Sequence, residues 1–217
     1  RGEKGQFILT GSATPNHKGI MHSGAGRIAK IRMHTMSLYE SGDSSGAVSL
    51  SELYRENFTP SMTGEVSLKK IIELIIRGGW PGSLGGGTYE TPVLANEYLN
   101  AVIDDDVYRI DGIRRDTVKM RLLLRSLARN ESTTASNKTL VNDIKIIDDG
   151  EVDSNTVGAY LDVFNRLFIT ENQPPFSSGI RSSVRIKQAE KRHFTDPSLA
   201  CALLNVTAES LLNDLET

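Results

Sequence analysis

The run Asp104–Asp106 places three carboxylates side by side, and carboxylate oxygens are the ligands that a hard divalent cation prefers. The run falls in a segment with helical periodicity, where neighbouring side chains point about 100° apart around the axis. Three consecutive carboxylates therefore cannot converge on one ion, and we interpret the run as a solvated or interdomain helix face. Asp105 and Arg109 stand at positions i and i+4, the spacing of an ordinary helical ion pair.

The glycine cluster Gly85–Gly87 is a second place to look for chemistry, because glycine-rich loops hold phosphate groups. A phosphate-binding loop, however, needs the spacing G-x-x-x-x-G-K-[ST] between a strand and a helix. No lysine follows this cluster, and Pro92 lies at the start of the next expected helix. We therefore predict a flexible linker.

Nucleophiles and metal ligands do not form a familiar pattern either. No Ser/His/Asp arrangement has the context of a nucleophile elbow. Cys201 is the only cysteine and lies within the apolar stretch LACALL, which predicts a small buried hydrophobe rather than a reactive thiol. The histidines lack the spacing of a metal site, and they are His17, His22, His34 and His193. The chain is poorly equipped for catalysis on its own, and we predict no metal site.

Charge and hydropathy argue against two broad classes of protein. The 217 residues carry a net charge of −2, so any attraction to nucleic acid or to an anionic membrane must come from a local basic surface. The longest apolar stretch, Ile71–Ile76, is too short to span a bilayer. No signal peptide is visible. We expect a soluble, cytoplasmic protein with no membrane partner.

Periodicity and capping residues predict a mostly helical chain preceded by two strands. The strands are expected at Gly5–Gly11 and Ile28–Met33, where apolar residues run together or alternate with polar ones. Two helices are expected to begin after the capping residues Ser67 and Asp153, and Gly78 is expected to end the first of them. Further helices are expected over 92–110, 117–128, 140–147, 199–204 and 208–215.

The segment 113–195 has the element order of a winged helix-turn-helix. Three expected helices precede an alternating stretch that Pro174 and Pro175 interrupt, as in a two-stranded hairpin. A winged helix of this kind can read DNA through its third helix, but the phosphates that dominate affinity require positive charge. The third helix offers little, since its exposed face would present one acid and one base among Asn155, Gly158, Asp162, Asn165 and Arg166. The hairpin offers more, and its candidate DNA-binding residues are Arg181, Arg185 and Lys187. A structural or interdomain winged helix is nevertheless the preferred interpretation.

Four motifs occur in one order along nearly the whole chain. They are GQFILTGSATP at 5–15, HSGAGRIAKIRMHTMSLYES at 22–41, GGWP at 78–81 and KRHFTDPSLACALL at 191–204. In these motifs the chain resembles the bacterial and archaeal ATPases of the AAA superfamily that carry a C-terminal domain of unknown function. That domain is a winged helix followed by a remnant of a restriction-nuclease-like fold.

The resemblance implies that the phosphate-binding loop of the nucleotide site lies outside this chain. In that family the nucleotide-binding sheet begins well upstream, with a Walker A loop and a Walker B strand. The run FILTGS resembles the next strand, and AKIRM resembles the last core strand. The intact parent would bind ATP and Mg²⁺, whereas this chain alone is expected to hold no cofactor.

The resemblance also gives roles to individual residues. Ser12 matches the sensor-1 position, where a hydroxyl can orient the attacking water or contact the γ-phosphate, and Thr10 is the alternative. Arg27 matches a recurrent family arginine that either stabilises the transition state or pairs with an acid of the ATPase body. Asp196 matches the aspartate that opens the nuclease-like portion, but we interpret it as a helix N-cap.

These inferences predict an α+β fold, mostly α, in four parts. Residues 1–40 would be the last strands of an incomplete ATPase core, 41–112 a helical connecting region, 113–195 the winged helix and 196–217 the start of a truncated nuclease-like region. The expected function is that of the coupling portion of an ATPase, whose partners would be the missing N-terminal half and a further protein or a second copy. The alternatives are a DNA-binding module and a non-enzymatic helical interaction protein.

Overall fold

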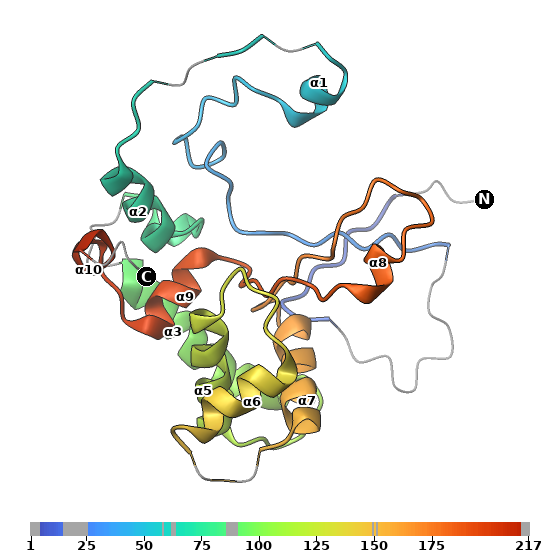
Figure 1. Cartoon of the computed structure of the whole chain (residues 1–217), viewed down its shortest axis with the longest axis vertical. Coiled ribbons are helices and arrows are strands. Elements are labelled where there is room, and N and C mark those ends of the chain that lie inside the picture. Colours follow the sequence, from blue (N-terminus) through green and yellow to red (C-terminus); the bar gives the residue numbers. More distant parts are fainter. Residues whose placement is uncertain are drawn as a thin grey trace.

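The computed structural model describes residues 5–14, 26–57, 59–61, 64–85, 91–148, 150 and 152–213, with the side chains of 91 and 185 left out. It is built from helices joined by long open segments (Figure 1). The helices, of which η1 is a 3₁₀ turn and η2 a π turn, are α1 (Leu50–Tyr54), α2 (Leu68–Arg77), η1 (Pro81–Ser83), α3 (Thr91–Ala101), η2 (Val102–Asp106), α4 (Val107–Arg109), α5 (Thr117–Arg129), α6 (Asn137–Lys145), α7 (Ser154–Arg166), α8 (Val184–Lys187), α9 (Pro197–Leu204) and α10 (Ala208–Asn213).

Local capping signals place several helix ends where the sequence predicts them. The Ser67 side chain accepts a hydrogen bond from the Lys70 N–H at the start of α2, which ends at Gly78. The Asp153 side chain accepts from the Thr156 N–H at 2.7 Å and begins α7. These bonds satisfy N–H groups that have no partner within their own helix. The predictions of both helices are confirmed.

One hydrophobic core is shared by helices from 95 to 202. Helix α5 packs against α6 and α9, α3 packs against α9, and α6 packs against α7; Figure 1 shows these five helices together, with α1 lying apart from them. Fully buried side chains come from each helix of the group, and removing one such side chain from water contributes about 1.5–3 kcal/mol. They include Leu99, Met120, Leu123, Leu140, Ile144, Phe164 and Leu199. This core continues across the predicted boundaries at 112 and 195.

The predicted α+β class is wrong, because no strand or sheet forms among the described residues. The segments expected to be the two N-terminal strands, around 7–9 and 28–33, run as open chain. A strand exists only when its backbone N–H and C=O groups pair with another strand. Apolar alternation identified segments suited to a sheet, but it could not supply the neighbour that a sheet requires.

The predicted winged helix is also wrong, because its hairpin does not form. Two isolated antiparallel bridges, Thr170–Phe194 and Gln173–Lys191, connect the segments that would have paired. The next residues, 174 and 175, are prolines, and proline has no backbone N–H to extend a ladder. Farther along, residues 184–187 form the helical turn α8 instead of a strand.

Candidate functional site

The residues with a proposed role in ATP chemistry, Ser12 and Arg27, lie in two open segments, 5–14 and 26–36, which we call the arm. Both residues are exposed, and neither has a hydrogen-bond or ion-pair partner in the described part of the chain. The apolar run before Ser12 is bare, since Phe7, Ile8 and Leu9 are 86%, 89% and 88% exposed. Successive side chains of an extended chain point to opposite sides. Both sides of this run are therefore uncovered.

The first arm segment is attached to the helical core directly after Ser12. Ala13 packs against the core. The Thr14 N–H donates to the backbone carbonyl of Arg166, in the last turn of α7, at 2.9 Å. Ser12 thus lies between the exposed apolar run and the residues Ala13 and Thr14, which contact the helical core.

Arg32 attaches the second arm segment. Its guanidinium lies over the Phe168 ring, 4.8 Å from the centroid, and donates to the Thr195 hydroxyl at 2.9 Å. The Glu171 carboxylate lies 3.7 Å from the Arg32 guanidinium and 3.0 Å from the His34 ring nitrogen Nδ1. The Arg32 Nε is buried and finds no hydrogen-bond partner among the described residues, which an arginine stacked on an aromatic ring tolerates.

Four residues farther on, the arm meets the junction between α2 and α3. The Met36 N–H donates to the Gly79 carbonyl at 2.8 Å. A Cβ at Gly79 would collide with the Met36 carbonyl, so only glycine allows the two backbones to approach this closely. Gly78 has φ +66° and ψ −170°, a conformation that side-chain-bearing residues rarely adopt. These contacts give a structural reason for the GGWP motif.

A buried carboxylate joins this junction to α9. Asp196 is 1% exposed and accepts from the Gly79 N–H at 2.8 Å, the Ser198 N–H at 3.0 Å and the Ser198 hydroxyl at 2.5 Å. The Trp80 ring N–H donates to the same hydroxyl at 2.9 Å. The prediction that Asp196 caps a helix is confirmed. We call Met36, Gly78, Gly79, Trp80, Asp196 and Ser198 the Asp196 junction, because they connect the arm, α2 and α9.

Arg166, a predicted DNA contact, belongs to a second charged cluster. Asp111 binds Arg115 through both carboxylate oxygens, at 2.9 and 2.6 Å, and lies 3.7 Å from Arg166. Arg166 also donates to the Ile110 carbonyl at 3.2 Å. The Arg115 guanidinium, by its hydrogen bonds to Asp111, lowers the pKa of that carboxyl. Arg166 thus already has partners within the chain.

This cluster predicts a pH dependence of stability. Asp111→Asn should lower the free energy of unfolding at pH 7 by about 1.5 kcal/mol after allowance for solvent screening. A carboxyl whose folded pKa is lowered stabilises the protein above its unfolded pKa of about 3.9, and this contribution is lost as the pH falls through the folded pKa. Urea unfolding at pH 7, 5 and 3 should show that the free energies of unfolding of the wild type and of Asp111→Asn converge below about pH 4. A constant difference would contradict this assignment.

The α7 face that was expected to read DNA borders a polar hollow of about 550 Å³. The acids Asp162, Glu171 and Glu190 line it together with two arginines and three asparagines. Asn155, the other candidate on α7, is exposed near the opposite end of that helix from Arg166. Three carboxylates at this face oppose the approach of a phosphate backbone. The structure therefore does not gather the predicted α7 contacts into one basic surface.

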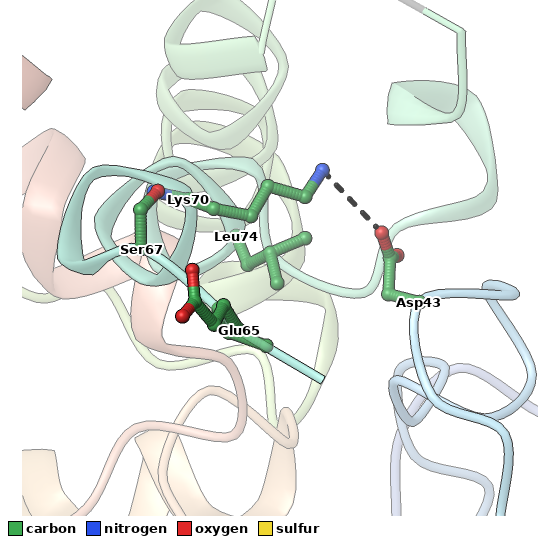
Figure 2. Close-up of a pocket in the computed structure, with 6 residues that line it drawn as sticks. Asp43, Glu65, Ser67, Lys70 and Leu74 are labelled. Atoms are coloured by element: carbon green, nitrogen blue, oxygen red, sulfur yellow. Dashed lines mark hydrogen bonds and ion pairs between the residues drawn. The ribbon is translucent and has the colours of Figure 1, made fainter. Parts of the chain in front are cut away.

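A larger hollow, of about 640 Å³, lies between α2 and the loop before α1. Figure 2 shows Lys70 reaching Asp43 across it, at 3.6 Å. Arg77 holds the other Asp43 oxygen at 2.7 Å and, with a hydrogen bond from Ser41, lowers the pKa of this carboxyl. Because cations contact both of its oxygens, Asp43 connects the loop before α1 to α2 and is not suited to proton transfer.

The remaining candidates for chemistry have structural partners. Arg121 binds Asp104 at 2.9 Å, and Arg109 pairs with Asp106 at 3.6 Å, so the expected Asp105–Arg109 pair is wrong. Among the residues that the structure describes, no three His, Cys, Asp or Glu side chains are placed to hold a metal ion. Burial raises the pKa of the Cys201 thiol to about 11, which makes it unreactive. His17, His22 and Gly86–Gly87 lie outside the described residues.

A comparison with protein-family models matches residues 68–210, more than half of the chain, to a family described as Domain of unknown function DUF8612. The chain belongs to the DUF8612 family. The DUF8612 region begins at the first residue of α2 and ends within α10, so it contains every residue of the Asp196 junction except Met36. The arm lies before it. No curated protein and no solved structure matches the chain.

Sequence reasoning missed two anchors of this arrangement, Arg32 and Asp111. The i, i+4 spacing of Asp111 and Arg115 is a signal that could have identified the second. Nothing local marks Arg32, because its partner Thr195 lies 163 residues away. Within the described residues, no helix has both the length and the apolar character needed to cross a bilayer.

Proposed function

We propose that this chain is the C-terminal part of an AAA-superfamily ATPase, in which the arm completes a nucleotide-binding sheet and the DUF8612 region couples that sheet to a partner. The observation that carries this proposal is the bare run Phe7–Leu9, uncovered on both sides. Strands of a parallel α/β sheet are covered on both faces and have apolar residues at consecutive positions. The run has the composition of such a strand, but no helix or other segment that the structure describes packs on either of its faces.

The free energy of burial supports a partner for this run. Removing three large apolar side chains from water contributes about 1.5–3 kcal/mol each. The second arm segment adds Ile31 and Met33, both 92% exposed. Side chains of this size on both arm segments are better explained by packing against another part of the protein than by exposure to water.

The position of Ser12 in the sequence, shortly after the apolar run, supports the proposal. In open α/β sheets, ligands bind beyond the carboxyl ends of the strands. Ser12 follows the apolar run at that end, with an exposed hydroxyl. When ATP and Mg²⁺ are held by the other half of the protein, they supply the scissile phosphate and its charge neutralisation. Ser12 would orient a water or contact a phosphate oxygen, and Arg27 would offer positive charge.

The attachment points of the arm support a coupling role. Arg32 and Met36 fix the second arm segment to two places in the helical core, the Phe168–Thr195 region and the Asp196 junction. A shift of the sheet would therefore be transmitted to α2 and α9 through the hydrogen bonds that Arg32 and Met36 make. This differs from a flexible tether, which would leave the core unaffected by the nucleotide.

A nucleotide-binding measurement tests the proposal. The gene upstream of Arg1 should encode G-x-x-x-x-G-K-[ST] within about two hundred residues, the length of one domain. The longer gene product should bind a fluorescent ATP analogue, and residues 1–217 alone should not. Tight binding by residues 1–217, or an upstream sequence without that motif, would overturn the proposal.

A further inference from the structure

We propose that residues 176–191, which we call the basic segment, bind duplex DNA through its phosphates. This proposal is independent of the ATPase function, because no residue of the arm takes part in it. It also differs from reading DNA with α7, whose face carries acids. In Figure 1 the basic segment projects around α8, away from α5 and α6.

Local charge is the first argument. The basic segment contains four Lys or Arg and a single carboxylate, Glu190, in a chain whose net charge is −2. Arg181, Lys187 and Lys191 are exposed, and none of them has an ion-pair partner in the part of the chain that the structure describes. Many arginines of the helical core, by contrast, are paired with carboxylates. Unpaired cations concentrated on one projection favour a polyanion.

The other side chains of the segment distinguish DNA from other anionic partners. Four serines and Gly179 separate the cations, and hydroxyls and exposed backbone N–H groups are common phosphate contacts. Three large apolar side chains, Phe176, Ile180 and Ile186, are 83%, 90% and 88% exposed. Such side chains enter between base steps in proteins that bind the minor groove. A lipid surface would have to desolvate the intervening serines along with them.

Fluorescence anisotropy of a fluorescein-labelled 20-base-pair duplex, titrated with the full chain, tests the proposal. We expect a Kd on the order of 10⁻⁵ M at 100 mM salt, as for sequence-independent binding. Three phosphate contacts predict a slope of about −2.7 for log K against log salt, or about 40-fold weaker binding at 200 than at 50 mM salt. Binding that does not change with salt would overturn the proposal.

A charge-matched pair of variants locates the contact. R181E/K187E/K191E should lose at least tenfold in affinity and most of the salt slope, by about 0.9 for each contact removed. R55E/K69E/R109E has the same net charge, but its reversals are at the C-terminal end of α1 and on α2 and α4, where the side chains are about 70% exposed. Equal losses in the two variants would show that only total charge matters, and would overturn the proposal.

Two further measurements separate DNA from the alternatives. Phe176→Ala with Ile180→Ala should weaken binding several-fold without changing the salt slope, because these side chains neutralise no phosphate. Vesicles of phosphatidylserine and phosphatidylcholine, sedimented with the chain, should leave it in the supernatant. Sedimentation with the vesicles, together with no binding to the duplex, would assign the basic segment to a lipid surface instead. Circular dichroism of each variant verifies that the helices are intact.

Discussion

Asp196→Ala is expected to lower the free energy of unfolding by about 4 kcal/mol, the largest loss that we predict for a single side chain of this protein. The substitution leaves the N–H groups of Gly79 and Ser198 and the Ser198 hydroxyl without their acceptor in a site that is 1% exposed. Each buried donor left unsatisfied costs about 1–3 kcal/mol, and the cap of α9 is lost as well.

The matched control for this variant is Asp153→Ala, which removes an aspartate N-cap from α7. Asp153 is exposed and makes its bonds only within its own turn. Urea unfolding monitored by circular dichroism should show a markedly smaller loss for Asp153→Ala. Equal losses would contradict the view that Asp196 joins the Gly79 backbone to α9 rather than only capping that helix.

Under the proposed ATPase function, Ser12→Ala is expected to lower the kcat for ATP hydrolysis of the proposed longer protein by about 10²-fold, the cost of removing one well-placed polar group from a transition state. The free energy of unfolding of the variant should not change, because Ser12 is exposed and its hydroxyl bonds to no described residue. Steady-state phosphate release measures the effect. Thr10→Ala is the comparison, since Thr10 is the alternative hydroxyl for the same role. Full activity in both variants would contradict the role assigned to this end of the arm.

The helices could be predicted from sequence because their signals are local. Ser67, Asp153 and Asp196 each cap a helix within three residues of their own position. The strands could not be predicted correctly, because an alternating segment such as 28–33 becomes a strand only beside a partner. In the expected hairpin, Pro174 and Pro175 withhold the N–H groups that a ladder requires, and the bridges stop at Gln173.

The candidate site could be predicted only in part, for a related reason. The sequence identified Asp196 as a cap, but its bond to Gly79 spans 117 residues and has no local signature. The positive charge of Arg166 favoured DNA contact, whereas the fold places this residue beside Asp111. A charge becomes available to a ligand only when the fold leaves it unpaired. This condition is met by Arg181 and Lys187 but not by Arg166.

Amide hydrogen exchange at Phe7–Leu9 tests the central proposal most directly, namely that this run, an open chain here, becomes a sheet strand when a neighbour from outside this chain pairs with it. In residues 1–217 these amides have no backbone partner among the described residues, and they should exchange at the rate of an unfolded peptide. In the longer gene product with bound ATP, they should be protected by at least about 10³-fold. Exchange that stays fast in the nucleotide-bound longer protein would contradict the account.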